Sequence, residues 1–208
     1  MSRIGVVVLA AGRSTRFASG ASSKLLASVR GAPLVRHAVT PAVDADVGEV
    51  VVVTGARSDD VASSLAGIRA RIVREPRFAD GMATSLVRGV LELRTVDAIM
   101  VALGDMPGVV PEAYRRIVAR WRAAGAPIVV PRYADARAQS HPTLFGSAMF
   151  DDLLALRGDV GARSVIARHA SQVIEEPLEW PAPRDVDTLD DLTEYLTAER
   201  TDDTSAAC

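Results

Sequence analysis

Four continuous apolar runs, rich in valine and isoleucine, constrain the fold of this 208-residue chain more than any other feature. They are residues 4–10 (IGVVVLA), 49–54 (EVVVVT), 97–103 (DAIMVAL) and 127–131 (PIVVP). A strand with one face in water alternates apolar and polar residues. Unbroken runs of this length are therefore typical of strands buried on both faces of a parallel sheet. Weaker runs at 70–75 and 171–176 predict two further strands.

Helical patterns lie between these runs, at 33–43, 58–68, 81–93, 111–125 and 185–199. Strands that alternate with helices predict an α/β fold in which a doubly wound, mostly parallel sheet forms the middle of three α/β/α layers. The length and the 49% of hydrophobic residues suit a single core. We therefore expect one domain over residues 1–198 and a disordered polar tail over 199–208.

Charge and composition argue against several classes of partner. A net charge of -2 predicts no nucleic-acid footprint, and no apolar run approaches the ~20 residues of a membrane span. The single cysteine, Cys208, can form no internal disulfide, and the first residues read directly as a core strand. These features predict a cytoplasmic protein.

The loop after the first run combines backbone freedom with positive charge. In residues 6–26 (VVVLAAGRSTRFASGASSKLL), small residues are followed by Arg13, Arg16 and Lys24. Exposed amides beside these side chains predict a phosphate-binding loop, because main-chain N–H groups and cations both favour anions. The glycine spacing fits neither a P-loop nor a dinucleotide fingerprint. A flexible loop with solvated arginines is the alternative interpretation.

Acidic residues follow another of the predicted strands. Asp105 comes directly after the run 97–103, where it could bind Mg²⁺, an ion that takes one or two carboxylates together with substrate phosphates. Either Asp185 or Asp187 could complete such a site. The alternatives are that Asp105 accepts hydrogen bonds within its turn, and that Asp187 or Thr188 caps the following helix.

Taken together, these motifs resemble the MobA-like nucleotidyltransferases. The segments that carry the resemblance are LAAGRSTRF and SKLL, GMATSLVRG, LGDMP, HPTLF, GDVGARSVI and DVDTLDDL, spread over residues 4 to about 195. They look most similar to the branch that contains molybdenum cofactor cytidylyltransferase and the xanthine dehydrogenase accessory proteins. The resemblance implies a Rossmann-like fold and Mg²⁺-dependent transfer of a nucleoside monophosphate from a nucleoside triphosphate to a phosphorylated acceptor, with release of pyrophosphate.

For that branch the resemblance implies CTP as donor, molybdopterin as acceptor and a molybdoenzyme as protein partner. Relatives that use GTP have Leu-Ala-Gly-Gly in the first motif, whereas this chain has Leu9-Ala10-Ala11-Gly12. The extra methyl group of Ala11 would narrow the base pocket, which favours a pyrimidine over a purine and therefore CTP over GTP.

Roles can be carried over residue by residue from the resemblance. The implied nucleotide-binding residues are Leu9, Ala10, Ala11, Gly12, Arg13, Ser14, Lys24, Gly81 and Ser85. The implied catalytic residues are Arg16, Lys24 and Asp105, and the implied metal ligands are Asp105 and Asp187. The implied acceptor-binding residues are His141, Pro142, Asp159, Gly161 and Arg163. Two departures are a longer segment before Lys24 and a serine, Ser140, where a glycine often precedes the histidine.

The implied chemistry needs no catalytic base, because a phosphate monoester with a second pKa near ~6 is already ionised at pH 7. Alignment and charge neutralisation would then supply most of the catalysis. Two alternatives remain open at this point. The acceptor could be another phosphorylated small molecule, such as a sugar or polyol phosphate, or the chain could be a non-catalytic protein that binds the molybdenum cofactor.

Overall fold

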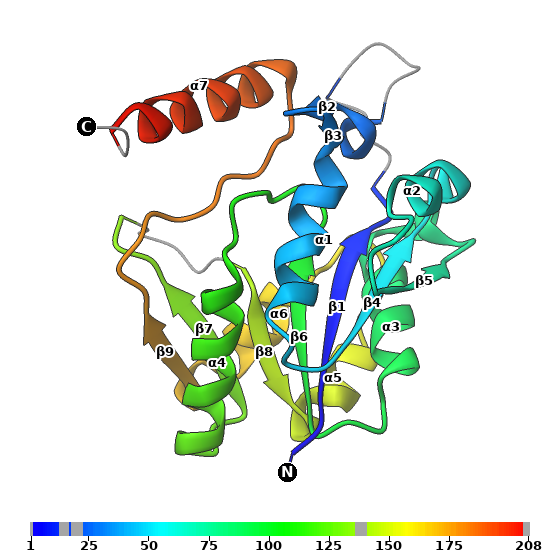
Figure 1. Cartoon of the computed structure of the whole chain (residues 1–208). Helices are drawn as coiled ribbons and strands as arrows, with labels where there is room; N and C mark the ends of the chain where they lie inside the picture. The colour runs from blue at the N-terminus through cyan, green and yellow to red at the C-terminus, as the bar shows by residue number, and fades with distance from the viewer. Residues whose placement is uncertain (1, 13–16, 18–22, 136–140, 206–208) are drawn as a thin grey trace.

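A computed structural model describes residues 2–12, 17, 23–135 and 141–205 of the chain. Its central sheet has seven strands in the order β5-β4-β1-β6-β8-β7-β9 (Figure 1). In chain order these are β1 (Ile4–Ala10), β4 (Glu49–Thr54), β5 (Arg71–Arg74), β6 (Ala98–Leu103), β7 (Ile128–Arg132), β8 (Thr143–Gly146) and β9 (Val173–Pro177). Neighbouring strands among β5, β4, β1 and β6 are parallel, as are β7 and β9. The predicted α/β fold with a mostly parallel sheet is confirmed.

One strand runs against the others. β8 pairs antiparallel with both β6 and β7, and it was not predicted from the sequence. It has only four residues, so its apolar character does not stand out as a long run. Its place between β6 and β7 brings the segment that begins at His141 next to the end of β6.

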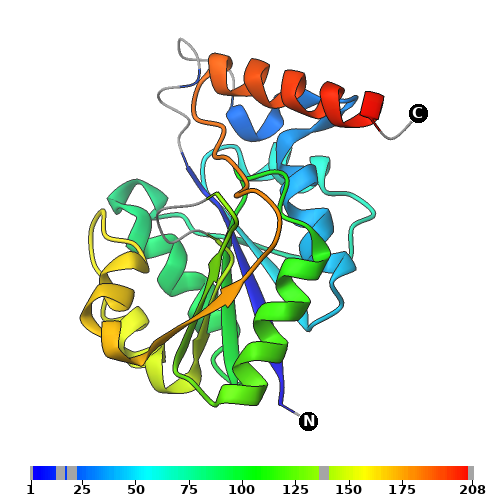
Figure 2. The ribbon, with the colours of Figure 1, turned by 90° about the vertical axis from the view of Figure 1, so that its left-hand side faces the viewer.

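The two faces of the sheet bury separate cores, which Figure 2 shows as two helix layers with the sheet between them. One face is covered by α1 (Leu34–Asp44), α2 (Ser58–Ser64) and α4 (Pro111–Ala124). The other is covered by α3 (Met82–Glu92), α5 (Phe150–Leu154) and α6 (Arg163–Arg168). In β1, Val6 and Val8 are fully buried in the first core and Val7 in the second. This double burial explains the unbroken apolar runs, because each valine contributes roughly 1.5–3 kcal/mol when it leaves water.

Three short 3₁₀ segments precede helices or strands near the ends of the sheet, namely η2 (Phe78–Asp80), η3 (Ser147–Met149) and η4 (Ala170–Gln172). A fourth, η1 (Lys24–Leu26), is followed by a small hairpin of β2 (Ser28–Val29) and β3 (Ala32–Pro33).

The last helix, α7 (Leu189–Ser205), lies at the end of the molecule opposite the N-terminus (Figure 1). It packs near the β2–β3 hairpin through a small apolar cluster that includes Val29, Leu34, Val186 and Leu192. The segment predicted as a disordered tail, 199–208, overlaps this helix as far as Ser205, and residues 206–208 lie outside the described residues. Within the described part of the chain, no helix is both long and apolar enough to cross a membrane.

Candidate functional site

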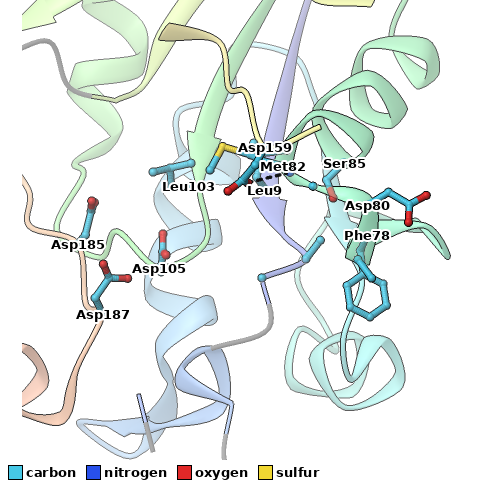
Figure 3. A pocket seen from close by; sticks show the side chains of 14 residues that line it. Leu9, Phe78, Asp80, Met82, Ser85, Leu103, Asp105, Asp159, Asp185 and Asp187 are labelled. Carbon is cyan, nitrogen blue, oxygen red and sulfur yellow. Dashed lines mark hydrogen bonds between the residues drawn. The ribbon is translucent and has the colours of Figure 1, made fainter. Parts of the chain in front are cut away.

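Two adjoining pockets open at the ends of the parallel strands, where ligands bind in sheets of this kind. The larger pocket has a volume of about 640 Å³ (Figure 3). Figure 3 shows Asp105, Asp185 and Asp187 together at one end of it. The opposite end is formed by Phe78, Asp80 and Ser85, and the wall between the two ends by Leu9, Met82, Leu103 and Asp159. Three of the five carboxylates that line the pocket therefore gather at one end, which we call the acidic end.

Lys24 joins the two predicted metal ligands at the acidic end. Its Nζ atom lies 2.5 Å from Oδ2 of Asp105 and 2.6 Å from Oδ1 of Asp187. The side chain of Lys24 is only 10% exposed. Burial alone would lower the pKa of Lys24, but Asp105 and Asp187 outweigh this effect and raise the pKa above its usual value. The ammonium therefore stays charged between the two carboxylates.

Main-chain hydrogen bonds hold these two carboxylates side by side. The amide of Val186 donates to the carbonyl of Asp105 at 2.9 Å, which joins the loop after β6 to the segment before α7. The start of α7 adds a capping arrangement in which the amides of Asp187 and Thr188 donate to Asp191, while the Asp191 amide donates to the Thr188 hydroxyl. The predicted cap at Thr188 is confirmed, and the side chain of Asp187 remains directed at Lys24.

Asp185 was weighed only as an alternative metal ligand, yet it lines both pockets. Burial, followed by the negative charges of Asp105 and Asp187, raises the pKa of Asp185, while Lys24 and Arg163 oppose this shift. Among the described residues, three carboxylates and the ammonium of Lys24 therefore meet at the acidic end, with Arg163 close enough to act on Asp185.

The residues present are compatible with a divalent ion that is bound partly by the protein and partly by phosphate. Among the described residues, no group of three or more histidine, cysteine, aspartate or glutamate side chains is arranged to hold a metal by itself. Mg²⁺ commonly needs only one or two carboxylates, with the remaining ligands supplied by water and substrate phosphates. Asp105 and Asp187 meet that requirement because both reach the same nitrogen atom.

The other end of the larger pocket brings together residues that are far apart in the sequence. Ala11 and Gly12 follow β1, and Gly81 and Ser85 lie at the start of α3. Leu9 lines both pockets, and Ala10 packs in the core instead. The predicted residues Arg13, Ser14 and Arg16 lie outside the described residues.

Gly81 is placed where a side chain could not fit. Its φ angle is +119°, and an added Cβ atom would lie 2.3 Å from the carbonyl carbon and oxygen of Gly158. The start of α3 is also tied to this segment, because the amide of Ala83 donates to the Gly158 carbonyl at 3.1 Å and that of Met82 to Asp159 at 3.4 Å. Gly81 therefore lets the backbone that precedes α6 pass against α3.

The smaller pocket, of about 290 Å³, shares a wall with the larger one. The shared residues are Leu9, Met82, Leu103 and Asp185. Its own lining is mostly apolar and includes Leu86, Val101, Met106, Ala162 and Ile166, to which His141, Gly161 and Arg163 add polar or small groups. Three of the five predicted acceptor-binding residues therefore line it. Asp159 lines the larger pocket, and among the described residues Pro142 lines neither of these two pockets.

His141 is held in one orientation. Its Nδ1 atom donates to the carbonyl oxygen of Val101 at 3.1 Å, and its own carbonyl accepts a hydrogen bond from the hydroxyl of Tyr133 at 2.8 Å. Burial lowers the pKa of His141 and outweighs the hydrogen bond to Val101; Arg163 adds to the lowering and Asp105 opposes it. The imidazole is therefore neutral at pH 7.

Several pocket residues were not found from the sequence. Phe78 and Asp80 line the larger pocket, and Met82 and Leu103 line both pockets. Phe78 and Asp80 follow the carboxyl end of β5, so the same rule that singled out Asp105 could have found them. Because the run at 70–75 predicted this strand only weakly, the residues that follow it were not singled out as candidates.

A family model for the MobA-like NTP transferase domain matches residues 6–173. The bifunctional protein GlmU of Agrobacterium fabrum is 34% identical over 161 residues, which cover 75% of this chain and 34% of GlmU. GlmU of Sphingopyxis alaskensis is 31% identical over 127 residues, which cover 61% of this chain and 28% of that protein. The chain thus spans about a third of the length of the curated relatives it matches.

Solved structures match over nearly the whole chain. Rv0371c from Mycobacterium tuberculosis H37Rv is 30% identical with a TM-score of 0.82, covering 94% of this chain and 98% of that one. A structure of Rv0371c in complex with manganese is 29% identical with a TM-score of 0.80, covering 95% and 100%. A nucleotidyl transferase from Methanothermobacter is 25% identical with a TM-score of 0.78, covering 96% and 99%.

Proposed function

The chain belongs to the MobA-like NTP transferase family, and from this premise we propose that it transfers CMP from CTP to the phosphate of molybdopterin. Mg²⁺ is the proposed cofactor, pyrophosphate is the second product, and a molybdoenzyme is the proposed recipient of the modified cofactor. The observation that carries the proposal is the pair of adjoining pockets. One ends at Asp105, Asp185 and Asp187, with the ammonium of Lys24 held between the first and the last of these, and the other shares Asp185 with that end.

CTP occupies the larger pocket in this proposal. Its base and ribose lie against Leu9, Ala11, Gly12, Gly81 and Ser85, and its triphosphate points to the acidic end. Lys24 neutralises phosphate oxygens there, and we retain Arg13, Ser14 and Arg16 as further contacts. Ala11 is only 8% exposed and lines the pocket, so its methyl group restricts the space for a base. This restriction supports CTP over GTP.

A divalent ion would be held by Asp105 and Asp187. When bound, it would stabilise negative charge on the phosphate oxygens of the nucleotide. The manganese in the Rv0371c complex belongs to that protein, and it supports the presence of a metal site in this chain without distinguishing Mg²⁺ from Mn²⁺.

The acceptor occupies the smaller pocket, where His141, Gly161 and Arg163 contact it, with Pro142 and Asp159 as supporting residues of the same segments. An oxygen of its phosphate attacks the α-phosphorus of CTP, and the bond from that phosphorus to the bridging oxygen breaks to release pyrophosphate. No proton needs to be removed from the attacking phosphate, which fits the neutral state of His141.

The lining of the smaller pocket supports molybdopterin over a sugar phosphate. Leu86, Val101, Met106 and Ile166 give the pocket an apolar wall, against which the hydroxyl groups of a sugar would leave water without replacement partners. A fused ring system can instead place its faces against apolar side chains. The GlmU relatives are the reason to retain sugar-phosphate transfer as the second candidate function.

The test is to incubate the full chain with each of the four α-labelled nucleoside triphosphates and Mg²⁺, in the presence of molybdopterin or glucose 1-phosphate. We expect label on molybdopterin from CTP, with pyrophosphate released in equal amount and loss of both in Asp105→Asn. Faster transfer to glucose 1-phosphate, or from GTP, would establish the alternative substrates. Binding of molybdopterin without any transfer would instead identify a non-catalytic accessory protein.

A further inference from the structure

Lys24 is the only lysine in the sequence, which otherwise uses arginine for its cationic side chains. A lysine ammonium is a compact point charge, whereas a guanidinium is a planar fork that spreads its charge over several donors. Only the compact group can fit between two oxygen atoms in the way that a metal ion does. The sole lysine lies between two carboxylates that line the larger pocket, and this position calls for a specific explanation.

The ammonium of Lys24 occupies the space between the proposed metal ligands. Its distances to Asp105 and Asp187, 2.5 and 2.6 Å, are only slightly longer than the roughly 2.0–2.1 Å at which carboxylate oxygens bind Mg²⁺. An ion that bridges the two carboxylates would therefore come within contact distance of the Nζ atom. Two cations at such a distance repel each other strongly in a partly buried site. The ammonium and the metal ion cannot share these oxygens.

From this geometry we propose that the ammonium of Lys24 is the counter-ion of Asp105 and Asp187 before any metal ion binds. When the nucleotide and the divalent ion bind, this ammonium moves from the two carboxylates to the triphosphate. The proposal gives Lys24 a positioning role in addition to phosphate binding. Before the nucleotide arrives, the ammonium keeps two like charges together and excludes a metal ion. When the triphosphate arrives, its negative charge attracts the ammonium and leaves the carboxylates for the ion.

The consequence is that the metal and the nucleotide bind as a pair. A metal ion alone has to break the ion pairs of Lys24 with Asp105 and Asp187 and supplies no phosphate in exchange, so it binds weakly. A nucleotide without metal draws Lys24 away from the same two carboxylates and supplies no divalent ion to replace it. Because coupling between two ligands is reciprocal, each should raise the affinity of the chain for the other by the same factor.

The inference rests on the proposed function only in using Asp105 and Asp187 as metal ligands, and it does not depend on the base or the acceptor. A role in phosphate binding alone makes the opposite prediction for metal binding. If Lys24 acted only on the triphosphate, its removal would weaken nucleotide binding and leave the affinity for a metal ion by itself unchanged.

The first experiment measures the binding of Mn²⁺ to the full chain by electron paramagnetic resonance, without nucleotide. We expect Lys24→Met to bind Mn²⁺ at least about tenfold more tightly than the wild type, because the competing charge is gone. Lys24→Arg separates charge from shape, since a guanidinium still repels the ion and should keep the affinity low. Adding Asp105→Asn to Lys24→Met should remove the gain, which locates the ion.

Arg69→Met is the matched control for the loss of one positive charge. Arg69 forms an exposed ion pair with Asp46, in which the two side chains are 81% and 82% exposed, and neither residue lines the larger pocket. This variant should bind Mn²⁺ as the wild type does. A tenfold gain in Arg69→Met as well would mean that net charge, rather than the ammonium at the site, controls the affinity, and the proposal would be wrong.

The second experiment uses the wild type alone and stays informative if Lys24→Met folds poorly. Lysine labelled with ¹³C at the ε carbon gives one side-chain signal, because the chain has one lysine. We expect Mg²⁺ alone at moderate concentration to leave this signal in place, and Mg²⁺ with CTP to shift it. A signal that is unchanged by Mg²⁺ and CTP together under saturating binding would overturn the proposal, as would equal Mn²⁺ affinity in the wild type and Lys24→Met.

Failure of the proposed function gives a different result. A chain that prefers GTP, or transfers to a sugar phosphate, would still show the tighter Mn²⁺ binding of Lys24→Met. A chain that transfers CMP to molybdopterin, but whose Mn²⁺ affinity does not rise in Lys24→Met, would keep the proposed function and lose this inference.

Discussion

Replacing Gly81 with alanine tests whether the contact between α3 and the segment before α6 depends on the absence of a side chain. The backbone of Gly81 has φ and ψ angles of +119° and 168°, a region that is almost restricted to glycine and costs other residues about 1–3 kcal/mol. The new Cβ atom would also lie 2.3 Å from Gly158 and 2.7 Å from the amide nitrogen of Asp159. Overpacking of this kind costs about 1–3 kcal/mol, so we expect Gly81→Ala to lose about 2–6 kcal/mol of unfolding free energy.

Gly158→Ala is the matched control, because Gly158 also has a positive φ angle, +66°, but an added Cβ atom there would meet no atom within 4 Å. It should lose only about 1–2 kcal/mol, the cost of the left-handed conformation. Urea denaturation at 25 °C, followed by circular dichroism, gives both free energies. The strain in Gly81→Ala should also displace residues 158–161 and raise KM for the acceptor more than KM for CTP. Equal destabilisation by the two variants would refute the close-approach argument.

Three further substitutions test the acidic end and the smaller pocket. Asp105→Asn should lower kcat/KM for transfer by roughly 100-fold or more, with an unchanged circular dichroism spectrum, since it removes charge at the site where phosphate charge is stabilised. Folding lowers the pKa of His141 from 6.5, its value in the unfolded chain. The contribution of the neutral imidazole to the free energy of unfolding is therefore complete above pH 6.5. That contribution is lost as the pH falls below 6.5, because the unfolded chain then binds the proton more readily than the folded chain. Urea denaturation at pH 5.5 and 7.5 should therefore show a smaller pH effect in His141→Gln than in the wild type. Thr188→Ala should cost about 1 kcal/mol through loss of the α7 cap, and it should weaken Mn²⁺ binding in the presence of CTP because the segment that holds Asp187 loosens.

The strands could be predicted because each one depends on a short run of consecutive apolar residues. All six predicted runs form strands. The four strong runs are the largely buried strands β1, β4, β6 and β7, where burial on both faces requires apolar residues at nearly every position, and the two weaker runs are the edge strands β5 and β9. β8 escaped prediction because it is short and because its neighbours, β6 and β7, come from other parts of the chain. The same limit applied to α5 and α6, which have five and six residues and show no clear helical period.

The candidate site was predicted in its parts and not in its arrangement. The rule that ligands lie beyond the carboxyl ends of parallel strands singled out Lys24 and Asp105. The same rule applied to β5 would have added Phe78 and Asp80. Asp185 could not be ranked above Asp187 in advance, because both stand in one acidic segment and only the folded chain shows that Asp185 lines both pockets.

The sequence by itself determined the alternation of buried strands and amphipathic helices, because that pattern depends on residues a few positions apart. It also determined which residue types stand at the strand ends. Only the tertiary structure decided that the ammonium of Lys24 meets Asp187, a residue 163 positions away, and lies between two carboxylates. Such a contact depends on how the chain returns across the sheet, and no local period in the sequence encodes that path.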